Sequence, residues 1–132
     1  MAKMSQHRLA CIVFAIITGA FGIFHLFNAK NMESKVPDFI PGGIIWIYIS
    51  GIAFVLASIA ILVNYHTKLA CYLLGVMLFI FVLVVHVPII VTGETEEIKQ
   101  TALIMMLKDV GLIMAAFLVG YNSDRPDTEP NL

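Results

Sequence analysis

Four long apolar runs, separated by short polar links, make up most of this chain. The runs cover 8–28, 43–63, 68–91 and 101–121. Each is continuously apolar, without the alternation of a barrel strand. Each also supplies the roughly 20 residues of helix that cross the hydrocarbon core of a bilayer. The pattern therefore predicts four transmembrane helices.

The links indicate how these helices are arranged. The link 64–67 is short and polar, so the second and third helices are expected to be antiparallel neighbours. The link 92–97 is acidic, and its glutamates suit the positive N-terminal end of the last helix. We therefore expect an all-α fold, with one transmembrane domain over 1–132 that forms an antiparallel up-down-up-down four-helix bundle. Its last residues, 122–132, are expected to form a disordered polar tail.

The first link, 29–43, is longer and differs in character. Pro37, Pro41 and the glycines that follow prevent a continuous helix. The segment is expected to lie at the membrane interface or to fold back over the bundle. Trp46 and Tyr48 come next, and such aromatic side chains favour the headgroup level.

Composition supports a membrane protein and excludes nucleic-acid binding. The chain is 60% hydrophobic and 13% charged, whereas a soluble domain is nearer half apolar and a quarter charged. The net charge is −1 and no basic patch is present, so the bilayer is the expected partner. Cys11 and Cys71 lie inside apolar runs and are interpreted as small buried hydrophobic residues. The first run is too long for a signal peptide, so we expect it to be retained.

The distribution of basic residues gives a weak preference for one orientation in the cell membrane. Placing both termini in the cytoplasm puts four basic residues inside against three outside, which agrees with the positive-inside rule. The inner set is Lys3, Arg8, Lys68 and Arg125, and the outer set is Lys30, Lys35 and Lys99.

Three of the four runs carry ionisable side chains, which are costly within a membrane and often functional. In an antiparallel bundle, His25, His86, Lys108 and Asp109 all fall in the outer half. At about 1.5 Å per residue, the expected depth is about 5 Å for His25, about 8 Å for His86 and about 10–12 Å for Lys108 and Asp109. Small residues share faces with them and should turn those faces inward. The faces are Thr18, Gly22 and His25; Ser50, Ala53, Ala57 and Ala60; Cys71, Gly75, Val82 and His86; and Asp109, Ala116 and Gly120.

Each of these residues also has a structural interpretation. Lys108 can extend to the interface, and its side chain should point about 100° away from that of adjacent Asp109. This difference predicts that the two cannot face one spot squarely. His25 can donate to a backbone carbonyl, and His86 can satisfy the turn that Pro88 disturbs.

As a set, the same residues indicate a small-molecule pocket. A histidine and an aspartate near an interface, with Trp46 and Tyr48 above, can bind a quinone head and relay its protons. The candidate ligand-binding residues are His25, His86, Lys108, Asp109, Trp46 and Tyr48. An alternative is axial ligation of haem or a metal by the two histidines. No complete catalytic constellation, glycine-rich phosphate loop or metal-spaced CxxC is present, so no catalytic or metal residues are assigned.

These residues resemble the DoxX-like family of small membrane proteins. The resemblance is carried by the stretch from Val36 to Gly43, by Tyr48 to Gly51, by Val85 to Pro88, and by the Lys108-Asp109 pair within 107–112. It implies a four-helix membrane protein, and members are linked to quinone-dependent or thiol redox systems. A glutamate common near the start of the second helix in that family is not evident here, which weakens any transfer of redox chemistry.

Two functions follow as hypotheses. One is an accessory subunit of a membrane redox system with a quinone-like pocket. The other is a non-catalytic assembly protein, in which small-residue faces pack a partner's helices or a second copy of the chain.

Overall fold

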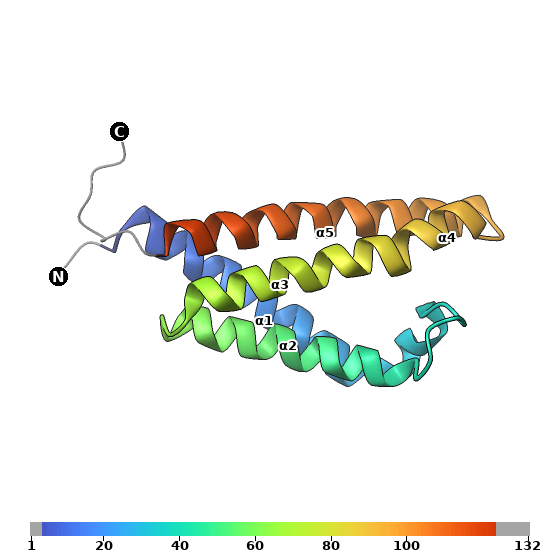
Figure 1. The fold of residues 1–132 in the computed structure, drawn as a ribbon, viewed down its shortest axis with the longest axis horizontal. Coiled ribbons are helices and arrows are strands. Elements are labelled where there is room, and N and C mark those ends of the chain that lie inside the picture. Colours follow the sequence, from blue (N-terminus) through green and yellow to red (C-terminus); the bar gives the residue numbers. More distant parts are fainter. Residues whose placement is uncertain (1–3, 124–132) are drawn as a thin grey trace.

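The computed structural model describes residues 4–123, which are mostly helical and form no strands (Figure 1). The elements in order are α1 (Gln6–Met32), η1 (Glu33–Lys35), α2 (Ile44–Leu62), α3 (Thr67–Phe81), η2 (Val82–His86), α4 (Val87–Thr92) and α5 (Glu96–Asn122). The predicted polar tail, from 124 onward, lies outside the described residues.

The prediction of four membrane-spanning helices is confirmed. Four helical stretches are long and apolar enough to cross a bilayer: Gln6–Lys35, Ile44–Leu62, Thr67–Thr92 and Glu96–Asn122. The third stretch combines α3, η2 and α4. The protein is therefore a multi-pass membrane protein built as an all-α bundle, and its exposed apolar side chains face lipid.

The last helix begins five residues earlier than predicted. Thr95 caps it, because its hydroxyl accepts the amide hydrogen of Ile98 at 3.2 Å. Glu96 and Glu97 then fall in the first turn, where the positive end of the helix favours them. The acidic residues that suggested a link thus form the start of α5.

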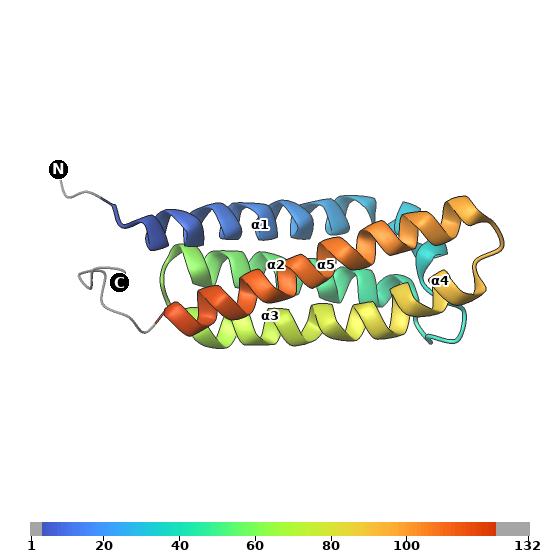
Figure 2. The same cartoon turned by 90° about the horizontal axis from the view of Figure 1, so that it is seen from above.

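The helices pack as two antiparallel hairpins. α1 pairs with α2, α5 pairs with α3, η2 and α4, and the contact between α2 and α3 joins the two hairpins. The start of α1 and the end of α5 lie at one end of the molecule, and the hairpins diverge toward the opposite end (Figure 1). Seen from above, α5 runs obliquely over the other helices (Figure 2). We call the end away from the chain termini the far end.

Small residues hold α1 against α2, as their spacing predicts. Gly22 lies so close to α2 that an added Cβ would meet the carbonyl oxygen of Gly51 at 2.8 Å. The hydroxyl of Ser58 donates to the carbonyl of Ala15 at 2.7 Å across the same interface. Thr18 is buried there as well. This hairpin therefore depends on close backbone approach more than on large side chains.

The second hairpin uses its small residues in the same way. A Cβ on Gly120 would lie 3.0 Å from the Cβ of Cys71, and one on Gly75 would meet the ring of Phe117 at 2.7 Å. Cys71 and Cys11 are buried, unbridged and part of one core cluster, as predicted.

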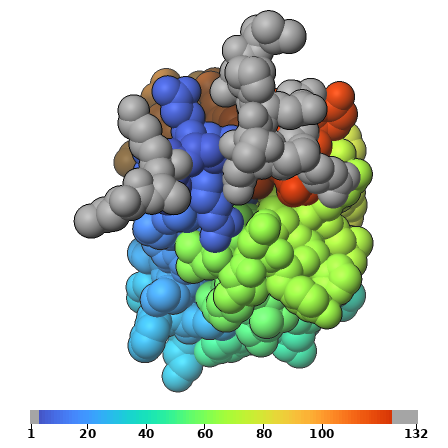
Figure 3. All heavy atoms as spheres, turned by 90° about the vertical axis from the view of Figure 1, so that its left-hand side faces the viewer, coloured from blue at the N-terminus to red at the C-terminus, as the bar shows by residue number. Residues whose placement is uncertain are grey.

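Arg8 joins the start of α1 to the end of α2. The guanidinium of Arg8 donates to the carbonyls of Ile61 at 3.0 Å and Leu62 at 2.6 Å. These carbonyls lie in the last turn of α2, at the negative end of the helix, so a cation suits them. Figure 3 looks onto this end of the molecule, where the start of α1 and the α2–α3 link come to the surface.

The link between α1 and α2 folds as a series of turns. Gly42 has φ +86°, a conformation that favours glycine, and it permits the turn that opens α2. The indole of Trp46 donates to the carbonyl of Pro41 at 2.8 Å. Trp46 therefore fastens the link to the first turn of α2.

Candidate functional site

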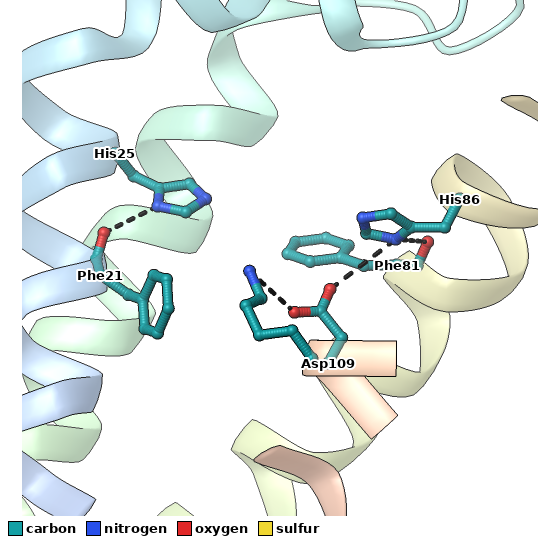
Figure 4. Close-up of polar contacts among 6 residues, drawn as sticks. Phe21, His25, Phe81, His86 and Asp109 are labelled. Carbon is teal, nitrogen blue, oxygen red and sulfur yellow. Dashed lines mark hydrogen bonds and ion pairs between the residues drawn. The ribbon is translucent and has the colours of Figure 1, made fainter. Parts of the chain in front are cut away.

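Asp109 is the buried carboxylate of the bundle interior. Only 4% of its surface is exposed, and it shares the inward face of α5 with Ile113 and Ala116. Two groups approach its oxygens: the Lys108 ammonium, 3.2 Å from Oδ1, and the His86 Nδ1, 3.7 Å from Oδ2 (Figure 4). A carboxylate in this setting is costly unless a partner compensates it, and the Lys108 ammonium supplies the compensating charge.

The lysine corrects one expectation from the sequence. Lys108 was expected to point away from the spot that Asp109 faces, but its ammonium reaches that carboxylate and lies 4.5 Å from the centre of the Phe21 ring. The four-carbon side chain bends back over its own turn, and 42% of it remains exposed. Lys108 thereby connects α5 to α1.

The position of Lys108 and Asp109 along α5 also differs from the prediction. Because α5 begins at Glu96, Lys108 and Asp109 lie near its middle instead of seven or eight residues from its start. They still meet His86, which lies in the last part of the third span. Side chains tilt toward the N-terminus of their own helix, so those on antiparallel neighbours lean toward one another.

His86 is positioned by an irregular turn. Residues Val82–His86 form a π-helix, in which the amide of Val87 donates to the carbonyl of Val82, five residues back. Pro88, which has no amide hydrogen, follows at once. The Nδ1 of His86 lies 3.1 Å from the carbonyl oxygen of Phe81. His86 therefore contacts a backbone carbonyl seven residues before Pro88, whereas an amide at position 88 would pair with the carbonyl of residue 83 or 84. That His86 satisfies the turn disturbed by Pro88 stays a prediction.

His25 is held by its backbone in a similar way. Its Nδ1 lies 2.7 Å from the carbonyl oxygen of Phe21, one turn earlier in α1, as its structural interpretation predicted. Its ring lies 5.3 Å from that of Phe54 on α2, and the Phe21 and Phe54 rings are 6.2 Å apart. His25 is half-buried and bordered by aromatic rings.

The close-up shows how these groups converge. The second ring nitrogen of His25 points away from α1 toward the space in front of η2, and that of His86 points back toward α1 (Figure 4). Asp109 lies between the two histidines in this view. The structure thus gathers four of the six predicted residues: His25, His86, Lys108 and Asp109. We call these four the polar cluster.

Trp46 and Tyr48 are placed differently. Both are exposed at the start of α2. Trp46 bonds to Pro41 in the link, and within residues 4–123 neither side chain has a hydrogen bond to the polar cluster. Their predicted part in ligand binding stays a prediction.

The comparisons place the chain in a family. Residues 14–120 match the model of a family described as a domain of unknown function, DUF8561. The chain belongs to this family. All members of the polar cluster lie inside the matched region. No curated protein and no solved structure matches the chain.

Outside the polar cluster, the described part of the DUF8561 chain offers one hollow and no cluster of metal-ligating side chains. Among residues 4–123, no group of three or more histidine, cysteine, aspartate or glutamate side chains could hold a metal ion. A hollow at the end near the chain termini is lined by Asn64, His66, Thr67, Lys68, Leu69, Tyr72 and Ser123. It is open, and its charged side chains are exposed. The buried ionisable chemistry therefore lies in the polar cluster.

Proposed function

We propose that this protein binds a lipid-soluble, quinone-like molecule at the polar cluster, between the middle of the bundle and its far end. The observation that supports this most directly is the burial of Asp109, together with the way the second nitrogens of His25 and His86 point toward each other's helices (Figure 4). A fold that needed only a compact core could use apolar residues there, which usually pack as well or better than a buried ion pair.

The chemistry of the cluster suits a planar head with oxygen substituents. The ammonium of Lys108 can donate to an oxygen, and imidazole nitrogens can donate a hydrogen bond to one or accept a hydrogen bond from its hydroxyl. The rings of Phe21 and Phe54 border His25 and can stack on a flat ring. The lipid-exposed helices allow such a molecule to reach the cluster from the bilayer.

We place this binding protein as an accessory subunit of a membrane redox system. It has no assigned catalytic residues, so electron transfer would be carried out by a partner. The relationship to DoxX-like proteins stays a prediction, because the family match carries no function. Haem held between the two histidines is the alternative ligand.

The assembly hypothesis is supported by one observation. Gly22, Gly51, Gly75 and Gly120 are occupied by contacts within the chain, whereas an added Cβ on Gly111 would meet nothing within 4 Å. Gly111 lies on the exposed side of α5, where a second helix could approach closely. A membrane partner or a second copy of the chain would dock there.

We also propose that both chain ends face the cytoplasm. Four spans return the chain to the side on which it began, and the basic residues slightly favour the cytoplasm for that side. The far end would then face outward.

The binding proposal is tested by native mass spectrometry of the protein extracted in a mild detergent. We expect extra mass that matches a quinone, and we expect Asp109→Asn and His25→Gln to reduce it. His7→Gln is the matched control, because His7 lies on the same helix near the chain-terminus end. Extra mass that matches haem would replace the quinone proposal. A folded protein that carries no small molecule and takes up no added quinone would contradict it.

A further inference from the structure

We propose that the polar cluster prefers a ligand that donates hydrogen bonds, so that it binds the hydroquinone form of a quinone-like molecule more tightly than the quinone form. This inference rests on the proposed function and specifies the chemical class of its ligand. The argument depends on which nitrogen of each histidine carries the hydrogen.

The backbone fixes that choice for both rings. A carbonyl oxygen can only accept, so the nitrogen beside it must donate. The Nδ1 of His25 lies 2.7 Å from the carbonyl oxygen of Phe21, and the Nδ1 of His86 lies 3.1 Å from that of Phe81. The carboxylate of Asp109, 3.7 Å from the same His86 nitrogen, is also only an acceptor when ionised. Each neutral ring therefore carries its hydrogen on Nδ1.

The second nitrogen of each ring is then an acceptor. In Figure 4 the second nitrogen of His25, Nε2, points away from α1 and that of His86 points back toward α1, with the Phe81 ring drawn between the two imidazoles. A positive charge on either imidazole is not required to balance Asp109, because the Lys108 ammonium, 3.2 Å from the carboxylate, already neutralises it. A charged imidazole would add an unbalanced cation to an apolar surrounding, which is costly.

The cluster consequently offers more acceptors than donors. Its acceptors are two imidazole nitrogens and the Asp109 carboxylate. Its one cation, Lys108, is engaged with that carboxylate and with the face of Phe21. A hydroquinone brings hydroxyl donors, and each can pair with an imidazole nitrogen that accepts. A quinone has only carbonyl oxygens, so it would leave the imidazoles unpaired and compete with Asp109 for the lysine.

The preference can be measured with three probes that share one ring and tail. They are decyl-benzoquinone, its hydroquinone, and the dimethyl ether of that hydroquinone, which has no hydroxyl hydrogen. Binding is titrated to the full-length protein in lipid nanodiscs without oxygen. We expect the hydroquinone to bind at least about tenfold more tightly than either other probe, since about 1.4 kcal/mol corresponds to tenfold.

Substitutions test whether the two histidines cause the preference for the hydroquinone. We expect His25→Phe and His86→Phe each to lower the ratio of hydroquinone to ether affinity. His7→Phe, on the same helix as His25 but near the other end, should leave that ratio unchanged. A helical spectrum and a cooperative melt confirm that each variant is folded.

The outcomes separate the two proposals. Binding of all three probes with equal affinity, or tighter binding of the quinone, overturns the donor preference and leaves the proposed function in place. Failure of every probe to bind the folded protein overturns both. Nitrogen-15 NMR of labelled histidines gives a test without ligand: hydrogen on Nδ1 is expected in both rings, and hydrogen on Nε2 alone would overturn the inference.

Discussion

The ammonium of Lys108 lies 3.2 Å from the carboxylate of Asp109, the residue that follows it in α5. The two partners differ in burial, since 6% of the Asp109 side chain is exposed whereas 42% of the Lys108 side chain is. If the pair is broken, the lysine can swing to the interface, but the carboxylate cannot leave the interior. The energetic cost of breaking the pair should therefore depend on which partner is removed.

A double-mutant cycle tests this asymmetry. We expect Lys108→Met to destabilise the protein by about 1–3 kcal/mol, less than a fully buried pair would because the lysine is partly exposed. Asp109→Leu should cost less, and the double variant should be close to the wild type. Unfolding in a mixed-detergent titration gives the free energies. Equal losses in both single variants that simply add would contradict the argument.

A second prediction concerns two glycines in opposite surroundings. Gly22→Ala should destabilise the protein by about 1–3 kcal/mol, because its Cβ would lie under 3 Å from Val55, Phe54 and the Gly51 carbonyl, so the helices must separate. Gly111→Ala is the matched control, with open space around it. It should be neutral or stabilising by up to about 1 kcal/mol. Thermal melts in detergent compare the two, and equal losses would show that helix packing is not the cause.

The sequence was sufficient to predict the helices and their inward faces. The four apolar runs and the spacing of residues such as Gly22, Gly75 and Gly120 identified which sides meet, because small residues are most useful where backbones approach closely. The predicted start of α5 was five residues too late. Acidic residues suit both a link and a helix N-terminus, and only the capping by Thr95 decides between them.

A third prediction follows from the contact that sequence reasoning missed. Arg8→Ala should lower stability by about 1–2 kcal/mol, since it leaves the carbonyls of Ile61 and Leu62 without their cationic donor. Arg8→Lys should recover only part of this, because an ammonium cannot present the paired donors of a guanidinium. Melting temperatures of the three proteins provide the measurement. Full recovery in Arg8→Lys would indicate that charge alone, without the forked geometry, is sufficient.

The candidate site was only partly predictable. Its ionisable members were identified because charge within an apolar run is rare. Their geometry depended on features that residue types do not encode, such as the bent path of the Lys108 side chain and the π-helix that aims His86 at Asp109. The carbonyl partners that fix both imidazoles also depend on local backbone geometry, which a pattern of apolar residues cannot specify.

The last prediction tests orientation with single cysteines. Gln6 lies at the start of α1 and Glu94 in the link before α5, both exposed and on opposite ends of the bundle. Cys11 and Cys71 are buried in the core and are replaced by alanine to give a clean background. If both chain ends are cytoplasmic, a membrane-impermeant maleimide should label Glu94→Cys in intact cells. Gln6→Cys should be labelled only after the cells are opened. The reverse pattern would place the far end in the cytoplasm, so the small excess of basic residues near the chain termini would not determine the topology.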